Sequence, residues 1–187
     1  MTGENKHRAS IHTFAAEAAL VATAWILLYA LNGWMFANLE VTEHVSWIFI
    51  PAALRMFSVM VLNWSAVMGL FVGAMITNNP VLGENMIHAL IGSTLTALGP
   101  YAATHLTIKL LRTANNFQGI SPKQLYIFGI TGSLCNVVPH CIWFWIDGAA
   151  SPWPTQFTPM FMGDMIGTTI ILYMASFAMK FVIKISH

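Results

Sequence analysis

Charged residues are scarce in this sequence. Asp, Glu, Lys and Arg make up 8% of its 187 residues, whereas soluble globular domains carry about 25%. Hydrophobic residues make up 57%. The charged residues are therefore too few to cover the surface of a soluble protein. The net charge is +1, which gives no basic footprint of the kind that binds nucleic acid, and we expect no nucleic-acid partner.

Cysteine and recognisable catalytic motifs are equally sparse. The two cysteines, Cys135 and Cys141, fall on different faces of a helix, so we expect two small buried residues and no disulfide between them. No cysteine cluster, C-x-x-C-H or H-x-x-E spacing indicates a metal site. A P-loop, a G-x-S-x-G motif and a pair of carboxylates at one depth are also missing. We therefore expect a protein that is not an enzyme.

Long apolar runs are what the sequence does have, and several approach the ~20 residues that cross a bilayer. They predict an all-α, polytopic transmembrane helix bundle with six hydrophobic segments, at residues 13–34, 47–62, 64–77, 86–111, 124–146 and 157–185. Segments 47–62 and 64–77 span only about 21–24 Å at a rise of ~1.5 Å per residue. We expect tilted short spans or a re-entrant hairpin there.

The distribution of basic residues predicts the orientation. We expect residues 1–12 to be a cytoplasmic tail and 13–185 a single transmembrane domain with a retained first span and both termini in the cytoplasm. The cytoplasmic ends then hold Lys6, Arg8, Lys109, Arg112, Lys123, Lys180 and Lys184. The outer loops hold Glu40, Glu43, Glu84 and Asp147, with no lysine or arginine.

Breaker residues separate and shape these segments. Polar or Pro/Gly-containing connections are expected at residues 38–44, 78–85, 112–123 and 147–156. Pro100 and Pro139 should kink their helices. Ser121-Pro122 and Thr158-Pro159 have the pattern of helix starts, with proline at the first helical position.

Two stripes of small residues predict close helix packing. The first has a four-residue spacing and consists of Ser65, Gly69, Gly73 and Thr77. The second consists of Gly163 and Gly167. Either stripe could form a homodimer face or pack inside one subunit.

Ionisable residues at membrane depth indicate a polar site, because they are costly there without a partner. Arg55 lies roughly 13 Å, and Asp164 and His140 roughly 10 Å, in from the outer ends of their segments. Asn136 shares a helix face with His140, which lies four residues later. Ser133 lies three residues before Asn136 and shares that face. We predict a cluster of Arg55, Asp164, His140 and Asn136 open toward the periplasm, with an Arg55–Asp164 ion pair. The cluster is either an inter-helix clamp or a ligand- or proton-responsive site.

Other ionisable residues in the segments suggest weaker sites. Glu17 should snorkel or pair with His12 or Lys109. His88 and His140 both fall in the outer half, so a bis-histidine haem or pigment site is conceivable. No cofactor is otherwise expected.

Several motifs resemble the membrane-associated sensor (MASE) type of integral membrane domain over about residues 47–175. They are W-I-F-I-P-A-A-L-R at 47–55, W-S-A-V-M-G-L-F-V-G-A at 64–74, I-G-S-T-L-T-A-L at 91–98 and M-G-D-M-I-G at 162–167. The resemblance implies a sensory module of the bacterial inner membrane, usually fused to kinase or cyclic-dinucleotide output domains. It places Pro51, Gly163, Asp164 and Gly167 on the family pattern.

The chain departs from that family by having fewer helices and by ending at His187 without an output domain. We therefore expect a sensor-type module that signals through a separate membrane partner. Its alternatives are an accessory or scaffold subunit of a larger membrane complex, in contact with pigment, haem or lipid, and a small-molecule transporter component. In each case the partners are lipid and other integral membrane proteins.

Overall fold

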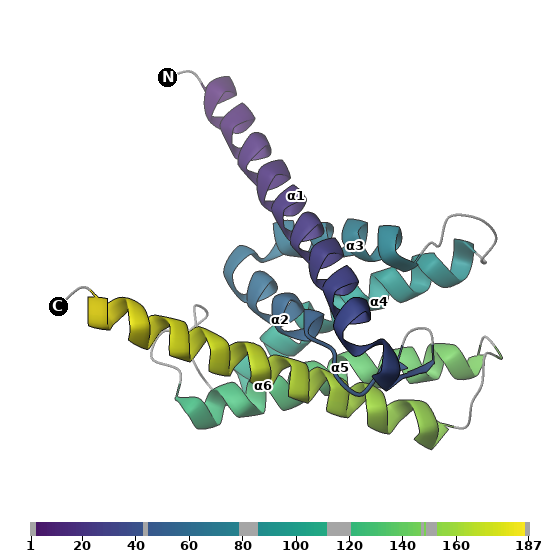
Figure 1. Ribbon diagram of the computed structural model, residues 1–187. Coiled ribbons are helices and arrows are strands. Elements are labelled where there is room, and N and C mark those ends of the chain that lie inside the picture. Colours follow the sequence, from purple (N-terminus) through teal and green to yellow (C-terminus); the bar gives the residue numbers. More distant parts are fainter. Residues whose placement is uncertain are drawn as a thin grey trace.

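Six helices follow one another along the described part of the chain in this computed structural model (Figure 1). The structure describes the backbone of residues 3–42, 45–78, 86–111, 121–146, 148 and 153–185, and the side chains of residues 10–41, 45–78, 86–111, 121, 123–146, 148 and 155–171. The helices are α1 (Gly3–Phe36), α2 (Pro51–Leu62), α3 (Trp64–Asn78), α4 (Met86–Leu111), α5 (Pro122–Ile146) and α6 (Trp153–Ile185). The all-α class predicted from the sequence is thus confirmed.

Two stretches of described residues are long and apolar enough to cross a membrane, Ser10–Leu39 and Lys123–Ile146. Only 17% of the apolar window of the first is buried, against 50% of the second. α1 therefore lies at the edge of the molecule, and its N-terminal half projects away from the other helices (Figure 1). α2 and α3 are apolar but short, with 12 and 15 residues.

The seam between α1 and α3 is formed by the first small-residue stripe. A side chain at Gly69 would collide with the backbone of Ala18, and one at Gly73 would approach the ring of Trp25 to 2.9 Å. At the ends of the stripe, Ser65 donates a hydrogen bond to Glu17 (2.6 Å) and the indole nitrogen of Trp25 donates to Thr77 (3.1 Å). The stripe thus packs inside one subunit. The expected pairing of Glu17 with His12 or Lys109 is wrong, because the nearby Ser65 hydroxyl supplies the donor.

A strand hairpin and an extended segment lie between α1 and α2. After the 3-10 turn η1 (Ala37–Leu39), β1 (Glu40–Thr42) pairs antiparallel with β2 (Val45–Ser46), with Glu40 opposite Ser46. We call residues 46–50 the strap. Its Phe49 N–H donates to the Gly163 carbonyl at 3.1 Å, and its Ile50 N–H donates to the Asn32 side chain at 2.9 Å.

The second small-residue stripe makes room for the strap. An added Cβ at Gly163 would fall on the carbonyl oxygen of Ser46, and one at Gly167 on that of Phe49. Helix α6 can therefore approach an extended backbone closely. This stripe also packs inside the subunit, although its partner is the strap instead of a helix.

Helix boundaries match the sequence in part. α4 has the predicted bounds, α3 ends one residue later at Asn78 and α5 begins at Pro122, where Ser121 and Gln124 form a reciprocal capping box (2.9 and 3.3 Å). The break between α2 and α3 is at Asn63, which has a φ of 55°. Helices α4 and α5 continue through Pro100 and Pro139.

Three helices begin at other residues than the predicted hydrophobic segments. α1 begins at Gly3 because residues 4–9 include good helix formers and no proline, so the expected tail is helical. α2 begins at Pro51, after the strap, since the strap's N–H groups bond to α1 and α6. α6 begins at Trp153, which leaves Pro159 inside the helix instead of at its start.

Some predictions fall on residues that the structure does not describe. These are the connections at 79–85 and 112–120, Glu43, Glu84, Arg112 and Asp147, together with the side chains of Lys6, Arg8, Lys180 and Lys184.

Candidate functional site

Three side chains from three helices form a closed ring of hydrogen bonds in the interior. Arg55 on α2 donates from one terminal nitrogen to Oδ1 of Asp164 on α6 (2.7 Å) and from the other to Oδ1 of Asn136 on α5 (2.7 Å). Asn136 closes the ring by donating from Nδ2 to Oδ2 of Asp164 at 2.9 Å. All three residues are at most 4% exposed. We call them the Arg55 ring.

Aromatic side chains cover the guanidinium group of Arg55. Its central carbon lies 5.9 Å from the ring centroid of Trp25 and 5.3 Å from that of Phe49. Each distance falls within the ~6 Å at which an aromatic face attracts a cation. Trp25 comes from α1 and Phe49 from the strap, so the charge of Arg55 is stabilised by four separate parts of the chain.

His140 extends the polar cluster by one helical turn along α5. Its Nδ1 lies 2.8 Å from the backbone oxygen of Asn136, and its Nε2 lies 3.4 Å from the hydroxyl oxygen of Thr96 on α4. The carbonyl can only accept, so Nδ1 carries the hydrogen in this contact and Nε2 can accept from Thr96. His140 is thereby held in one orientation beside the Arg55 ring.

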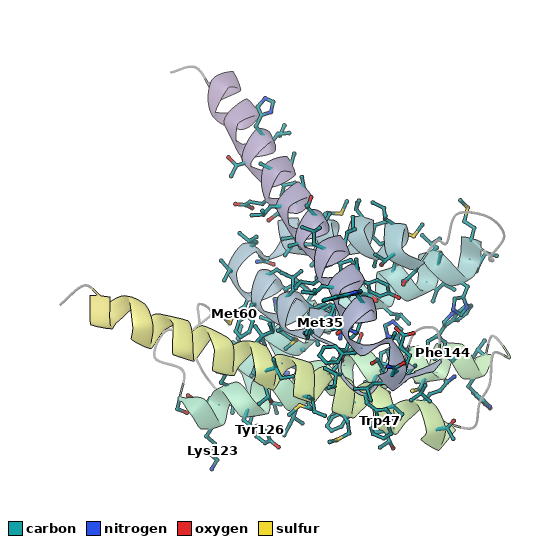
Figure 2. The ribbon with its side chains drawn as sticks, viewed as in Figure 1. Met35, Trp47, Met60, Lys123, Tyr126 and Phe144 are labelled. Carbon is teal, nitrogen blue, oxygen red and sulfur yellow. The ribbon has the colours of Figure 1, made fainter. Side chains whose placement is uncertain are left out.

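A cavity of about 80 Å³ lies against the Arg55 ring, and we call it the outer pocket. All six helices and the hairpin contribute residues to it, including an aromatic wall of Trp25, Tyr29, Phe49 and Phe144. Glu40, which is exposed, also lines it, so the outer pocket reaches the surface beside the hairpin. Figure 2 labels Phe144, which lies toward the end of α5 opposite Lys123 and Tyr126. The volume is large enough for several water molecules or a small ligand group.

A second cavity of about 10 Å³ is also bordered by Arg55, Asn136 and Asp164. Ser133 and Thr168 line it, together with Gly129 and Gly132. Its volume suits about one water molecule. The Arg55 ring therefore borders two cavities of very different size.

The structure brings together the four residues of the predicted cluster, Arg55, Asp164, His140 and Asn136. Ser133, predicted on the same helix face, borders the smaller cavity. The arrangement joins α2, α5 and α6 and adds α4 through Thr96. It ties these helices together and borders the outer pocket.

The proposed haem or pigment ligands His88 and His140 line the same pocket, and the Phe144 ring lies near both, at 5.9 and 6.1 Å. The cavity of about 80 Å³ is far below the ~300–1,000 Å³ of sites for larger ligands. Both ring nitrogens of His140 already contact oxygen atoms. Among the described residues, no group of three or more His, Cys, Asp or Glu could hold a metal ion. The described cavity is therefore smaller than a site for a haem or a pigment.

Sequence reasoning did not find the site residues Trp25, Phe49, Asn32 and Thr96. Asn32 did have a signal, because it is an amide inside an apolar run. The two aromatic residues had none, since phenylalanine and tryptophan occur throughout this chain. Thr96 is one of several threonines in its helix, and only the fold places it beside His140.

Comparisons of the chain with protein-family models, with curated proteins and with solved structures find no match. The geometry of the site therefore carries the functional argument by itself.

Proposed function

We propose that this chain is a multi-pass protein of the bacterial inner membrane, with its six hydrophobic helices forming one bundle. Large apolar side chains face outward on several helices, such as Leu27, Val61, Leu110 and Trp145, each at least 62% exposed. The interior holds small and polar residues beside hydrophobic ones. Large apolar side chains on the exterior, with the charged Arg55 and Asp164 inside, suit lipid as the surrounding solvent.

The N-terminal end of α1 and the C-terminal end of α6 point to the same side of the molecule (Figure 1). This supports both termini being cytoplasmic, as does the clustering of basic residues at the expected inner ends. Lys123 marks the inner end of α5 and Glu40 the outer face in this orientation.

Orientation can be tested by labelling single cysteines in intact cells with a membrane-impermeant maleimide, after Cys135 and Cys141 are replaced by alanine. Both Glu40 and Lys123 are exposed, so they form a matched pair. We expect Glu40→Cys to react from outside and Lys123→Cys to react only after permeabilisation. Labelling of Lys123→Cys in intact cells contradicts the proposed topology.

Within that membrane bundle, we assign the chain the role of a non-enzymatic, sensor-type module that acts through a separate partner protein. One observation carries this function: the outer pocket reaches the surface and has the Arg55 ring, which ties α2, α5 and α6, in its wall. A ligand that contacts the ring would favour one arrangement of these helices over another. Helix α6 continues from Asp164 to Ile185, so a shift there reaches the opposite side of the bundle.

The sensor function is tested by comparing partner output between ring and non-ring variants. Asp164→Asn keeps the side-chain size and one acceptor oxygen but removes the charge that faces Arg55. We expect it to change the activity of the co-purified partner while the complex still assembles in mild detergent. Thr169→Ala, at an exposed position on the same helix, is the matched control. Unchanged output in Asp164→Asn complexes would contradict the sensor function.

A second candidate function is an accessory or scaffold subunit of a larger membrane complex. It is favoured by the N-terminal half of α1, which projects away from the other helices (Figure 1). In that half, Ile11 and Phe14 are 56% and 41% exposed. A stoichiometric complex that is lost in Ile11→Gln/Phe14→Gln, with output unaffected by Asp164→Asn, would favour this candidate.

A further inference from the structure

Asn32, which lines the outer pocket, has side-chain hydrogen-bond donors that are not used among the described residues. It is 3% exposed and lines that cavity. Its Oδ1 accepts the Ile50 N–H at 2.9 Å, which fixes the orientation of the amide because a nitrogen in that place could not accept. The Nδ2 group therefore points elsewhere, and its two N–H donors have no acceptor among the described residues.

Arg55, which lines the same pocket, also has spare donors. A guanidinium group carries five N–H donors. Two of them are used, one for Asp164 and one for Asn136, and the others have no acceptor within the described part of the chain. Asn32 bonds to the strap at Ile50 and Arg55 stacks on the strap at Phe49, so both sets of donors flank the same short segment.

The side-chain acceptors of Asp164, Asn32 and Asn136 already accept hydrogen bonds, whereas the spare donors donate to no acceptor among the described residues. Asp164 uses both carboxylate oxygens, and the side-chain oxygens of Asn32 and Asn136 each accept a bond. Donors on residues that line a cavity can bond to an acceptor that enters it, so a molecule that brings acceptor oxygens gains hydrogen bonds here. The complementary ligand is thus rich in acceptors.

The charge balance of the pocket favours a neutral ligand over an anion. The charge of Arg55 is already matched by Asp164 at 2.7 Å. A second anion would lie in the same low-dielectric space as Asp164, with Glu40 also lining the pocket, and like charges repel strongly there. A carbonyl oxygen accepts the same hydrogen bonds without adding charge.

The size of the outer pocket and the residues in its walls narrow the chemical class of the ligand further. The cavity of about 80 Å³ is roughly half of the ~150 Å³ that holds one benzene molecule. The aromatic residues Trp25, Phe49 and Phe144 line the cavity, and aromatic rings pack well against a planar group. A planar amide or ketone group of about four or five heavy atoms meets both requirements.

We propose that the outer pocket binds the neutral carbonyl or carboxamide group of a small molecule, with its oxygen accepting from Asn32 Nδ2 and the spare donors of Arg55. This assignment rests on the proposed sensor function, for which it names the chemical class of the ligand.

The test uses three fluorinated probes of nearly equal size and different charge: fluoroacetamide, fluoroacetate and fluoroethylammonium. Each is titrated against the full chain in lipid nanodiscs and followed by fluorine NMR. Such small ligands bind weakly, so we expect a Kd on the order of 1 mM for fluoroacetamide. We expect fluoroacetate and fluoroethylammonium to bind about tenfold more weakly or worse.

The variant Asn32→Asp tests the contribution of the Asn32 Nδ2 donors to probe binding. Its carboxylate still accepts the Ile50 N–H, but the Nδ2 donors are gone. We expect fluoroacetamide affinity to fall about tenfold in this variant and to remain unchanged in Asn38→Asp, an exposed position outside the pocket. If Asn32→Asp does not accumulate, Asn32→Ser, whose hydroxyl oxygen can accept the same N–H, gives the equivalent measurement.

Two results overturn the proposal: fluoroacetate binding as tightly as fluoroacetamide, or equal fluoroacetamide affinity in the wild type and the Asn32 variant. Neither result depends on partner output or cysteine labelling. Probe binding without any change in partner output would contradict the sensor function while leaving the pocket chemistry intact.

Discussion

Asp164 on α6 and Arg55 on α2, 109 positions apart in sequence, share a 2.7 Å hydrogen-bonded ion pair in the interior. Neither side chain is more than 5% exposed. Each would be an uncompensated buried charge without the other, so the pair ties the two helices together whatever ligand the pocket binds.

The stability losses from removing each member of this pair should not be additive. We expect Arg55→Met or Asp164→Leu alone to lower the free energy of unfolding by about 3–5 kcal/mol. The double variant should lose less than the sum of the single losses, with a coupling of about 0.5–3 kcal/mol. Chemical denaturation in detergent micelles measures this. Glu40→Gln with Lys123→Met, both exposed and on different elements, is the additive control pair.

The contact of α6 with the strap predicts that alanine substitutions at two glycines will have different effects on stability. Gly167→Ala places a methyl group on the carbonyl oxygen of Phe49, and backbone yields poorly, so we expect a loss of about 1–3 kcal/mol or more. Gly33→Ala meets no atom within 4 Å and should be neutral or stabilising by about 0.5–1 kcal/mol, as expected for alanine in a helix. The melting temperature of Gly167→Ala should fall, whereas that of Gly33→Ala should stay the same or rise. Equal shifts would mean that the strap does not contact Gly167.

At the α1–α3 seam, Ser65→Ala removes the hydroxyl that donates to Glu17 at 2.6 Å. The carboxylate loses that hydrogen bond in a partly buried place, which should cost about 1–3 kcal/mol. Thr169→Ala removes a hydroxyl that bonds only to its own helix at an exposed position, at Met165, and should cost little. Thermal unfolding of the two variants in the same detergent compares them.

The effect of substitutions at Asn63, where the chain breaks between α2 and α3, should depend on the backbone conformation that the new residue allows. With a φ of 55° and a ψ of −119°, this residue occupies a region that glycine adopts freely and other residues rarely do. Asn63→Gly should be tolerated or slightly stabilising, whereas Asn63→Val should destabilise by about 1–3 kcal/mol. Similar melting temperatures for both variants would show that the α2–α3 junction has another conformation.

Part of the candidate site was predictable because its cause is local to the sequence. Arg55 and Asp164 stand in apolar runs, and an ionised group there needs a partner of opposite charge at a similar depth. Asn136 and His140 followed from helical spacing. None of these arguments requires knowledge of the fold beyond the order and direction of the helices.

The rest of the site could not be predicted because it depends on nonlocal packing. Glu17 has several polar residues within sequence reach, and only the α1–α3 seam selects Ser65. Gly163 and Gly167 follow a pattern typical of helix pairs, yet their neighbour is an extended strap. Small residues allow close approach by any backbone, so the pattern does not identify the element that approaches.

The sequence by itself determined the all-α class, the bounds of α4 and the identity of the buried charges, because hydrophobic periodicity, breaker residues and the cost of isolated charge act locally. Only the tertiary structure decided that Trp25 and Phe49 cover Arg55, that Asn32 bonds to the strap, and that these residues surround one pocket. Those contacts join segments far apart in the chain. Their formation depends on how whole helix faces pack, which no single stretch of sequence specifies.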